Sequence, residues 1–253
     1  MKRLVGVTLL TLLGCSLWAQ EPGASPSIES LTKELNAARK KLVDWGGLNV
    51  YGSDDSEIPA PKPGENRVVF LGDTLTADWG KGKAPFFPGK PYFNRGIALQ
   101  TTPQMLVRFR QDVIDLKPKV VVIEGGFDDI GMVMGPGSEG TIADNLTTMI
   151  ELAKLHGIKV VIASLTPVCD CYGTQTRLRP VGKIAAINGT LRGLAKDTGS
   201  VYLNYYSVLV DTDAGTRQMK KALTDDGINP NDAAYALMAP LAEQAIADAL
   251  ATK

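Results

Sequence analysis

The sequence predicts an α/β protein in which helices cover both faces of a sheet of about five parallel strands, a three-layer α/β/α sandwich. From Arg67 onward, short apolar runs alternate with longer segments of helical periodicity. Uninterrupted apolar runs are typical of strands buried on both faces, and strands that alternate with helices form parallel sheets. The 253 residues, 44% of them hydrophobic, are enough for one such domain.

The elements follow from these two patterns. The clearest strand has a Val-Val-Val-Ile core that ends at Gly125-Gly126, and the clearest helix start is Thr102-Pro103, because Thr suits an N-cap and Pro the first helical position. Strands are expected at residues 67–72, 92–94, 119–124, 158–164 and 200–204. Helices are expected at residues 102–116, 141–155, 181–196 and 231–251.

The N-terminus has the pattern of a secretory signal. Lys2 and Arg3 precede an apolar run from Leu4 to Trp18, which is short for a membrane span and has no stop-transfer flank. Cleavage is expected near Ala19 or Gln20, which predicts a secreted or periplasmic protein. The alternative is a lipobox, Leu12-Leu-Gly-Cys15, which would leave the protein anchored to a membrane through an acylated Cys15.

Three segments are therefore expected: a signal peptide (1–20), an N-terminal helix and linker (21–66) and the α/β domain (67–253). In the second segment, Leu31, Leu35, Ala38 and Leu42 recur at helical spacing, which predicts a helix over 30–44. Residues 51–66, with three prolines, are expected to form an extended connector.

The charged, cysteine and histidine residues limit the kinds of partner and site that the chain can have. The 27 basic and 27 acidic residues balance, so the composition does not indicate a nucleic-acid partner. Cys169 and Cys171 are expected to be ordinary thiols, because a disulfide between residues two apart closes a small, strained ring. His156 is the one histidine, and it ends a helix before a strand, at the sheet edge opposite the strand end at Gly72.

Four short motifs resemble, in order and spacing, the conserved blocks of the SGNH (GDSL) esterase and lipase family. Gly72-Asp73-Thr74, which ends the first strand, looks like block I. The other three are Asn94-Arg-Gly-Ile-Ala-Leu-Gln-Thr-Thr102 for block II, Val121-Val-Ile-Glu-Gly-Gly-Phe-Asp-Asp-Ile130 for block III, and Thr224-Asp-Asp-Gly-Ile-Asn-Pro-Asn231 for block V. The resemblance covers residues 67–247 and implies the flavodoxin-like SGNH hydrolase fold.

The resemblance also implies ester hydrolysis of small acyl or acetylated-sugar substrates without a cofactor, but the catalytic positions are replaced. Family enzymes use a Ser nucleophile, a Gly and an Asn in the oxyanion hole, and a His base oriented by an Asp. The matching positions here are Thr74, Leu99, Asp128, Asn229 and Asp226, of which Asp226 alone keeps the family residue. Gly96 matches an earlier, structural glycine of block II.

Each replacement has a physical consequence. The extra methyl group of Thr74 stiffens χ1 and crowds attack on an acyl carbon, and a hydroxyl is a weak nucleophile without an adjacent base. The amide of Asn229 is not a base, and Asn229 with Pro230 would instead suit the N-cap of the last helix. An ionised Asp128 only accepts hydrogen bonds, so it would repel a developing oxyanion. The side chain of Leu99 is expected to occlude the site.

The sequence therefore predicts a family member with little or no esterase activity, which retains binding of an acylated or carbohydrate ligand. The alternative is an active hydrolase with Thr74 as nucleophile and a rearranged base, for which Asp128 is a candidate. Asp73, Asp128, Asp129, Asp226 and Asn229 could together hold Ca²⁺ or Mg²⁺. We expect no metal, because carboxylates at 73 and 129 are usual in family members without one.

Overall fold

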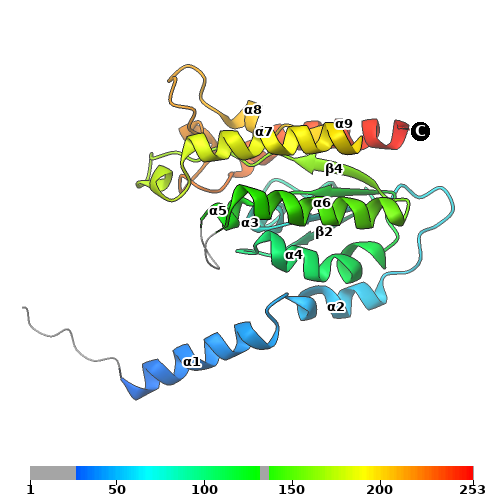
Figure 1. Cartoon of the computed structure of the whole chain (residues 1–253), viewed down its shortest axis with the longest axis horizontal. Coiled ribbons are helices and arrows are strands. Elements are labelled where there is room, and N and C mark those ends of the chain that lie inside the picture. The colour runs from blue at the N-terminus through cyan, green and yellow to red at the C-terminus, as the bar shows by residue number, and fades with distance from the viewer. Residues whose placement is uncertain (1–26, 132–136, 253) are drawn as a thin grey trace, which may run out of the picture. The chain divides into compact units, whose positions relative to one another are not determined.

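The computed structural model of the chain describes residues 27–131 and 137–252 (Figure 1). The predicted signal peptide, including Cys15, lies outside the described residues. The chain divides into two compact units, residues 1–43 and 44–253. The described part of the first unit is one helix, α1 (Ile28–Val43), which lies where the apolar spacing predicted a helix.

The second unit contains a five-stranded parallel sheet with the order β2-β1-β3-β4-β5. The first residues of the three neighbouring strands β1, β2 and β3 are aligned: Val68 of β1 pairs with Tyr92 of β2 and with Val120 of β3. The five predicted strands are confirmed within two residues at each end. Their bounds are β1 (Val68–Gly72), β2 (Tyr92–Gly96), β3 (Val120–Ile123), β4 (Lys159–Ala163) and β5 (Val201–Leu203).

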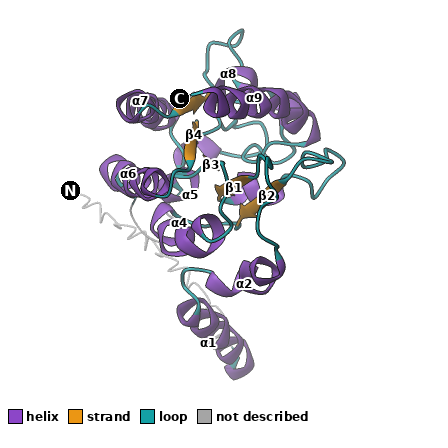
Figure 2. Cartoon of the chain, turned by 90° about the vertical axis from the view of Figure 1, so that its right-hand side faces the viewer, coloured by secondary structure: helices purple, strands orange, loops and turns teal. Residues whose placement is uncertain are grey.

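Helices connect the strands and cover both faces of the sheet, as the α/β/α prediction requires (Figure 2). The four predicted helices are present, with the first continued by a π-helical turn, η1. The bounds are α2 (Leu48–Glu57), α3 (Thr74–Asp78), α4 (Thr102–Phe109), η1 (Arg110–Ile114), α5 (Phe127–Ile130), α6 (Glu139–Leu155), η2 (Gln175–Arg177), α7 (Val181–Thr198), α8 (Tyr206–Leu209), η3 (Lys221–Leu223) and α9 (Asp232–Ala251).

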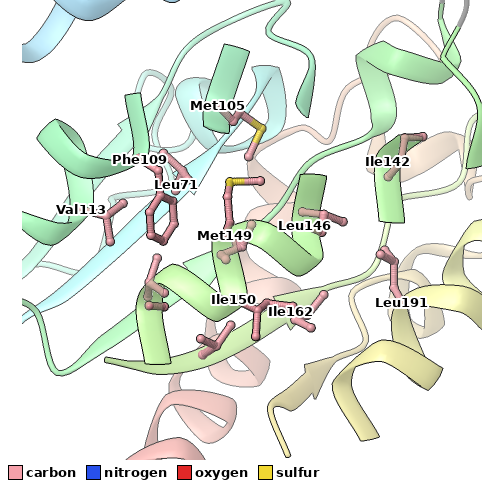
Figure 3. Packing of buried hydrophobic residues seen from close by; sticks show 14 of the residues in the cluster. Leu71, Met105, Phe109, Val113, Ile142, Leu146, Met149, Ile150, Ile162 and Leu191 are labelled. Carbon is pink, nitrogen blue, oxygen red and sulfur yellow. The ribbon is translucent and has the colours of Figure 1, made fainter. Parts of the chain in front are cut away.

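Alternate residues of the strands point into two separate cores, because successive side chains of a strand face opposite sides. On one face, Leu71, Ile123 and Ile162 pack against α4, α6 and α7. Figure 3 shows this core, in which Phe109 and Met149 lie over the sheet. On the other face, Phe70 and Val122 pack against α9 and the aromatic residues that follow α3. The central strands β1, β3 and β4 are therefore buried on both sides, whereas the edge strands β2 and β5 are partly exposed.

Residues 48–57 form α2, so the first part of the connector predicted over residues 51–66 is helical and not extended. The carboxylate of Asp44 accepts hydrogen bonds from the N–H groups of Leu48 (2.8 Å) and Asn49 (2.9 Å), which stabilises the start of the helix. Asp55 of α2 forms a buried ion pair with Arg95 of β2, and the Tyr51 ring stacks on the same guanidinium. Pairing with Arg95 is a tertiary effect that the local sequence does not reveal, and α2 belongs to the second compact unit.

The cap of α9 also differs from the prediction. The N-cap is Asn231, whose Oδ1 accepts hydrogen bonds from the N–H groups of Ala233 (3.1 Å) and Ala234 (3.2 Å). Asn229 lies two residues earlier and has a different partner, described below. Within the described residues, no helix is both long and apolar enough to cross a membrane.

Candidate functional site

Three of the predicted site residues meet at the carboxyl edge of the sheet. Thr74 follows β1, Leu99 follows β2 and Asp128 follows β3. The Leu99 N–H donates to Thr74 Oγ1 (2.8 Å), and the Thr74 hydroxyl donates to Asp128 Oδ2 (3.0 Å). In open α/β sheets this edge is where ligands bind. The three residues that the sequence motifs singled out, Thr74, Leu99 and Asp128, are therefore joined by hydrogen bonds.

Backbone geometry fixes the position of Thr74. It is the first residue of α3, and the Asp73 carboxylate caps this helix by accepting from the Leu75 N–H (3.2 Å). Leu99 has a left-handed backbone (φ 63°), which a non-glycine residue adopts at some energetic cost. Leu99 is 56% exposed, so its side chain is not packed in the core.

Asp128 is also paired with a cation that the sequence did not suggest. The Arg179 guanidinium donates to Asp128 Oδ1 (3.1 Å) and stacks over the Phe127 ring at 4.5 Å. Gly131 leaves room for Arg179, because a Cβ at that position would lie 2.5 Å from its Nη2. Arg179 is in the loop before α7, 51 residues from Asp128, so only the folded chain brings the two together.

A buried carboxyl group lies behind Thr74. Glu124 Oε2 accepts from the hydroxyl of Thr76 (3.1 Å) and from the N–H of Asp73 (3.4 Å). Burial raises the pKa of Glu124 to about 7. Burial, with the neighbouring charges of Glu124 and Asp128, raises the pKa of Asp73 well above its usual range. The pKa of Asp128 is also raised by burial, although Thr74 and Arg179 oppose the shift. The sequence offered one signal for Glu124: it is an acidic residue directly after the apolar run of β3.

These shifts predict that stability falls as pH rises. Below about pH 4.5 Glu124 is protonated in both the folded and unfolded chain, whereas up to its folded pKa of about 7 only the folded chain keeps the proton. The folded state therefore binds more protons in this window, so its free energy of unfolding decreases with pH. We expect the melting temperature to fall between pH 5 and pH 8, and Glu124→Gln to reduce this fall. Glu151→Gln, at an exposed position, is the control, and an equal effect of both changes would contradict the assignment.

Asp226 and Asn229 form a second pair. Asp226 Oδ1 accepts from the N–H groups of Ile228 and Asn229 (2.7 Å each), and its Oδ2 accepts from the Asn229 side-chain amide (2.7 Å). Burial raises the pKa of Asp226, but these hydrogen bonds outweigh it, so the net shift is downward. No hydrogen bond in the described ranges joins this pair to Thr74. Asp226 thus holds the side-chain amide of Asn229, and an amide is not a base.

Cys169 and Cys171 form a disulfide, so the prediction of two free thiols is wrong. Their Cα atoms are 5.3 Å apart, which lies within the normal range and shows that a separation of two residues permits the bond. The loop that contains them supports the Asp226 segment. The Cys169 N–H donates to Gly227 O (2.8 Å), and a Cβ at Gly227 would lie 2.5 Å from the Cys169 carbonyl oxygen.

Removing this disulfide should destabilise the protein only modestly. The loop that it closes is very short, and the chain-entropy relation gives about 1–2 kcal/mol for such a loop. We expect Cys169→Ser/Cys171→Ser to lower the melting temperature by a few degrees and to speed amide hydrogen exchange in residues 225–230. Exchange in β3 is the internal control. Faster exchange in β3 by the same factor would contradict a local effect.

His156 lies at the other edge of the sheet. It is the C-cap of α6, three residues before the start of β4, whereas Thr74 follows the end of β1 in a parallel sheet. It therefore lies opposite the candidate site, as the element order predicted. Within the described residues, no three or more His, Cys, Asp or Glu side chains are grouped so that they could hold a metal ion.

The sequence of the chain matches a protein-family model. The model is that of the GDSL-like lipase/acylhydrolase family, and it matches residues 51–237. The chain belongs to this family. The predicted membership and the α/β/α fold are therefore both confirmed, and the matched region includes the blocks that contain Thr74, Leu99, Asp128 and Asn229.

Solved structures of related proteins have the same fold. A GDSL-like lipase from Bacteroides thetaiotaomicron VPI-5482 is 32% identical, with a TM-score of 0.74 over 81% of this chain and 98% of that one. A candidate acylhydrolase from Bacteroides fragilis NCTC 9343 is 35% identical, with a TM-score of 0.75 over 81% and 97%. A catalytic mutant of an acetylxylan esterase from Geobacillus stearothermophilus, at 18% identity and a TM-score of 0.58 over 75% and 96%, shares the fold.

One curated protein matches over a shorter region. It is the uncharacterized lipoprotein YqeF of Bacillus subtilis (strain 168), which is 34% identical over 83 residues. The match covers 32% of this chain and about a third of YqeF (34%).

Proposed function

We propose that this chain is a catalytically impaired member of its family that binds a hydroxyl-bearing ligand, such as a carbohydrate or an acylated sugar, at the Thr74 edge. The observation that supports this most directly is the hydrogen bond from Thr74 to Asp128. The family resemblance assigns the Asp128 position to an oxyanion-hole donor, and a carboxylate there accepts hydrogen bonds instead. Replacing a donor by a negative charge should cost more than the roughly 100- to 1,000-fold typical of losing one donor.

Two further contacts support impairment. The Leu99 N–H, the other oxyanion donor implied by the resemblance, is directed at the Thr74 hydroxyl itself. Asn229 is bonded to Asp226 but has no basic nitrogen to accept a proton from a nucleophile. Without a base, catalysis in a comparable triad falls by about a million-fold.

The same site suits a sugar-like ligand. Thr74 is half-buried, and its hydroxyl can donate to or accept from ligand hydroxyls, while the buried Asp128 carboxylate fixes the position of that hydroxyl. Arg179 keeps Asp128 paired in the absence of ligand, so no isolated charge is buried. The ligand would need no ester bond to be recognised.

One contact favours a second candidate, an active hydrolase. Asp128 Oδ2 is 3.0 Å from Thr74 Oγ1, which is within the reach of a general base, and burial raises the pKa of Asp128. In this candidate Asp128 would take the Thr74 proton as the oxygen attacks an acyl carbon. The Arg179 charge opposes this role, because it stabilises the ionised form of Asp128.

Hydrolysis of short-chain aryl esters separates the two candidates. We expect the protein, Thr74→Ala and Asp128→Asn to show the same background rate. Hydrolysis that both Thr74→Ala and Asp128→Asn abolish would overturn the impaired assignment and support Asp128 as the base. Binding of xylo-oligosaccharides with and without acetyl groups, measured by calorimetry, tests the ligand class, and Thr74→Val is the matched variant that removes only the hydroxyl.

We also propose that the chain is exported, and that it is either released after cleavage near Ala19 or anchored through Cys15. The basic and apolar N-terminus supports export, and the YqeF match, a lipoprotein by name, supports the anchored form. Mass spectrometry of the mature N-terminus distinguishes the two forms. An intact Met1 on the mature protein would contradict both.

A further inference from the structure

Basic side chains gather at the sheet edge opposite Thr74. Arg110 of η1, Lys117 of the turn before β3 and His156 of the α6 C-cap line one hollow of about 400 Å³, here called the basic hollow. A neighbouring hollow of about 270 Å³ contains Lys154 and Lys159. Asp115 is the one acidic residue lining either of them. In a chain with a formal net charge of zero, this edge is locally positive.

The three basic residues of the basic hollow come from separate elements, so the fold brings them together. In the part of the chain that the structure describes, none of Arg110, Lys117 and His156 forms an ion pair within 4.0 Å. All three are exposed, while Ile114 and Ile158, which also line the hollow, are buried. The basic hollow therefore combines exposed positive charges with an apolar floor.

Two backbone features distinguish the basic hollow from an ordinary charged surface. η1 is a π-helical turn at the end of α4, and such turns are frequent at functional sites. Lys117 has a left-handed backbone (φ 51°), which is uncommon for a residue with a long side chain. Leu99 of the candidate site has the same unusual conformation. The backbone is therefore locally strained both at Leu99 and at Lys117.

We propose that the basic hollow is a binding site for a small organic phosphate, separate from the Thr74 site and independent of its function. A phosphate monoester carries about −1.5 to −2 charges at pH 7 and has three strong acceptor oxygens. Arg110, Lys117 and His156 can each donate to one of them. The apolar floor contacts the organic part of the ligand, and the volume lies in the range of small-molecule sites.

The single histidine makes the proposal directly testable. Because His156 is the one imidazole in the chain, its Cε1–H proton is a unique NMR signal at the basic hollow. We expect phenyl phosphate, titrated into the full chain, to shift this signal with saturation, and inorganic phosphate to bind more weakly because it lacks an apolar part. Benzyl alcohol, without the charge, should not compete.

Matched charge variants test the location of the site. Lys117→Gln should weaken phenyl phosphate about ten-fold, as expected for the loss of one charged hydrogen bond. Lys220→Gln removes the same charge at an exposed position near the other edge and should leave the affinity unchanged. An unshifted His156 signal at about 10 mM phenyl phosphate, roughly ten times a millimolar Kd, would overturn the proposal. Equal weakening by both variants would also overturn it.

A vesicle measurement identifies the source of the phosphate. Vesicles containing phosphatidylglycerol should not retain the protein in a sedimentation assay, because the proposed ligand is a soluble molecule that enters the hollow. If the protein bound these vesicles through Lys117 but did not bind phenyl phosphate, the ligand would be a lipid surface and the proposal would be overturned.

Discussion

Restoring four side chains should create esterase activity in this protein. The variant is Thr74→Ser, Leu99→Gly, Asp128→Asn and Asn229→His, and we expect hydrolysis of short-chain aryl esters to rise at least about a thousand-fold above background. The Asp128→Asn change would supply an amide donor to the oxyanion. The imidazole that Asn229→His introduces would lie where the Asp226 carboxylate already holds a side-chain amide at 2.7 Å. Asp226 would then orient this imidazole as the base.

The matched control carries the same three other changes with Ala at position 74. It should return to background, because the nucleophile is then absent. Asp128→Asn leaves Arg179 without its ionic partner, so the melting temperature of each variant must show that it is folded. A folded four-site variant without activity would show that the defect lies outside these positions.

Loss of the Arg108 guanidinium should have the largest effect on stability. Arg108 is fully buried, and it donates to Asp112 Oδ2 (2.7 Å), the Arg95 carbonyl (2.7 Å) and the Gly72 carbonyl (3.0 Å). These bonds join α4 and η1 to the ends of β2 and β1. Arg108→Met should lower the free energy of unfolding by about 3–5 kcal/mol, because it leaves a buried Asp112 without its cation.

A second variant separates the unpaired charge from other causes. Arg108→Met/Asp112→Leu should recover part of the loss, since no buried charge then lacks a partner. Arg177→Met, at an exposed position, is the control for removal of a positive charge and should change the free energy by less than about 0.5 kcal/mol. Chemical denaturation measures all three. A loss below about 1 kcal/mol in Arg108→Met would contradict the assigned role of the network.

The candidate site was only partly predictable. Thr74, Leu99 and Asp128 follow the ends of neighbouring strands, so their convergence could be expected from the motifs and the parallel topology. The pairing with Arg179 could not be expected, because Arg179 lies in an irregular loop 51 residues from Asp128 along the chain. The Cys169–Cys171 disulfide was missed because a general strain argument was applied to a loop whose backbone permits the bond.

The sequence by itself determined the architecture and the family. Apolar runs alternating with amphipathic segments specify buried parallel strands and their covering helices, because burial on both faces depends on local pattern. The tertiary structure alone decided how the site is charged and where the second unit begins. α2 is held by a buried ion pair with Arg95, and Asp128 is neutralised by Arg179. Such pairs depend on distances between segments far apart in the chain, which no local pattern encodes.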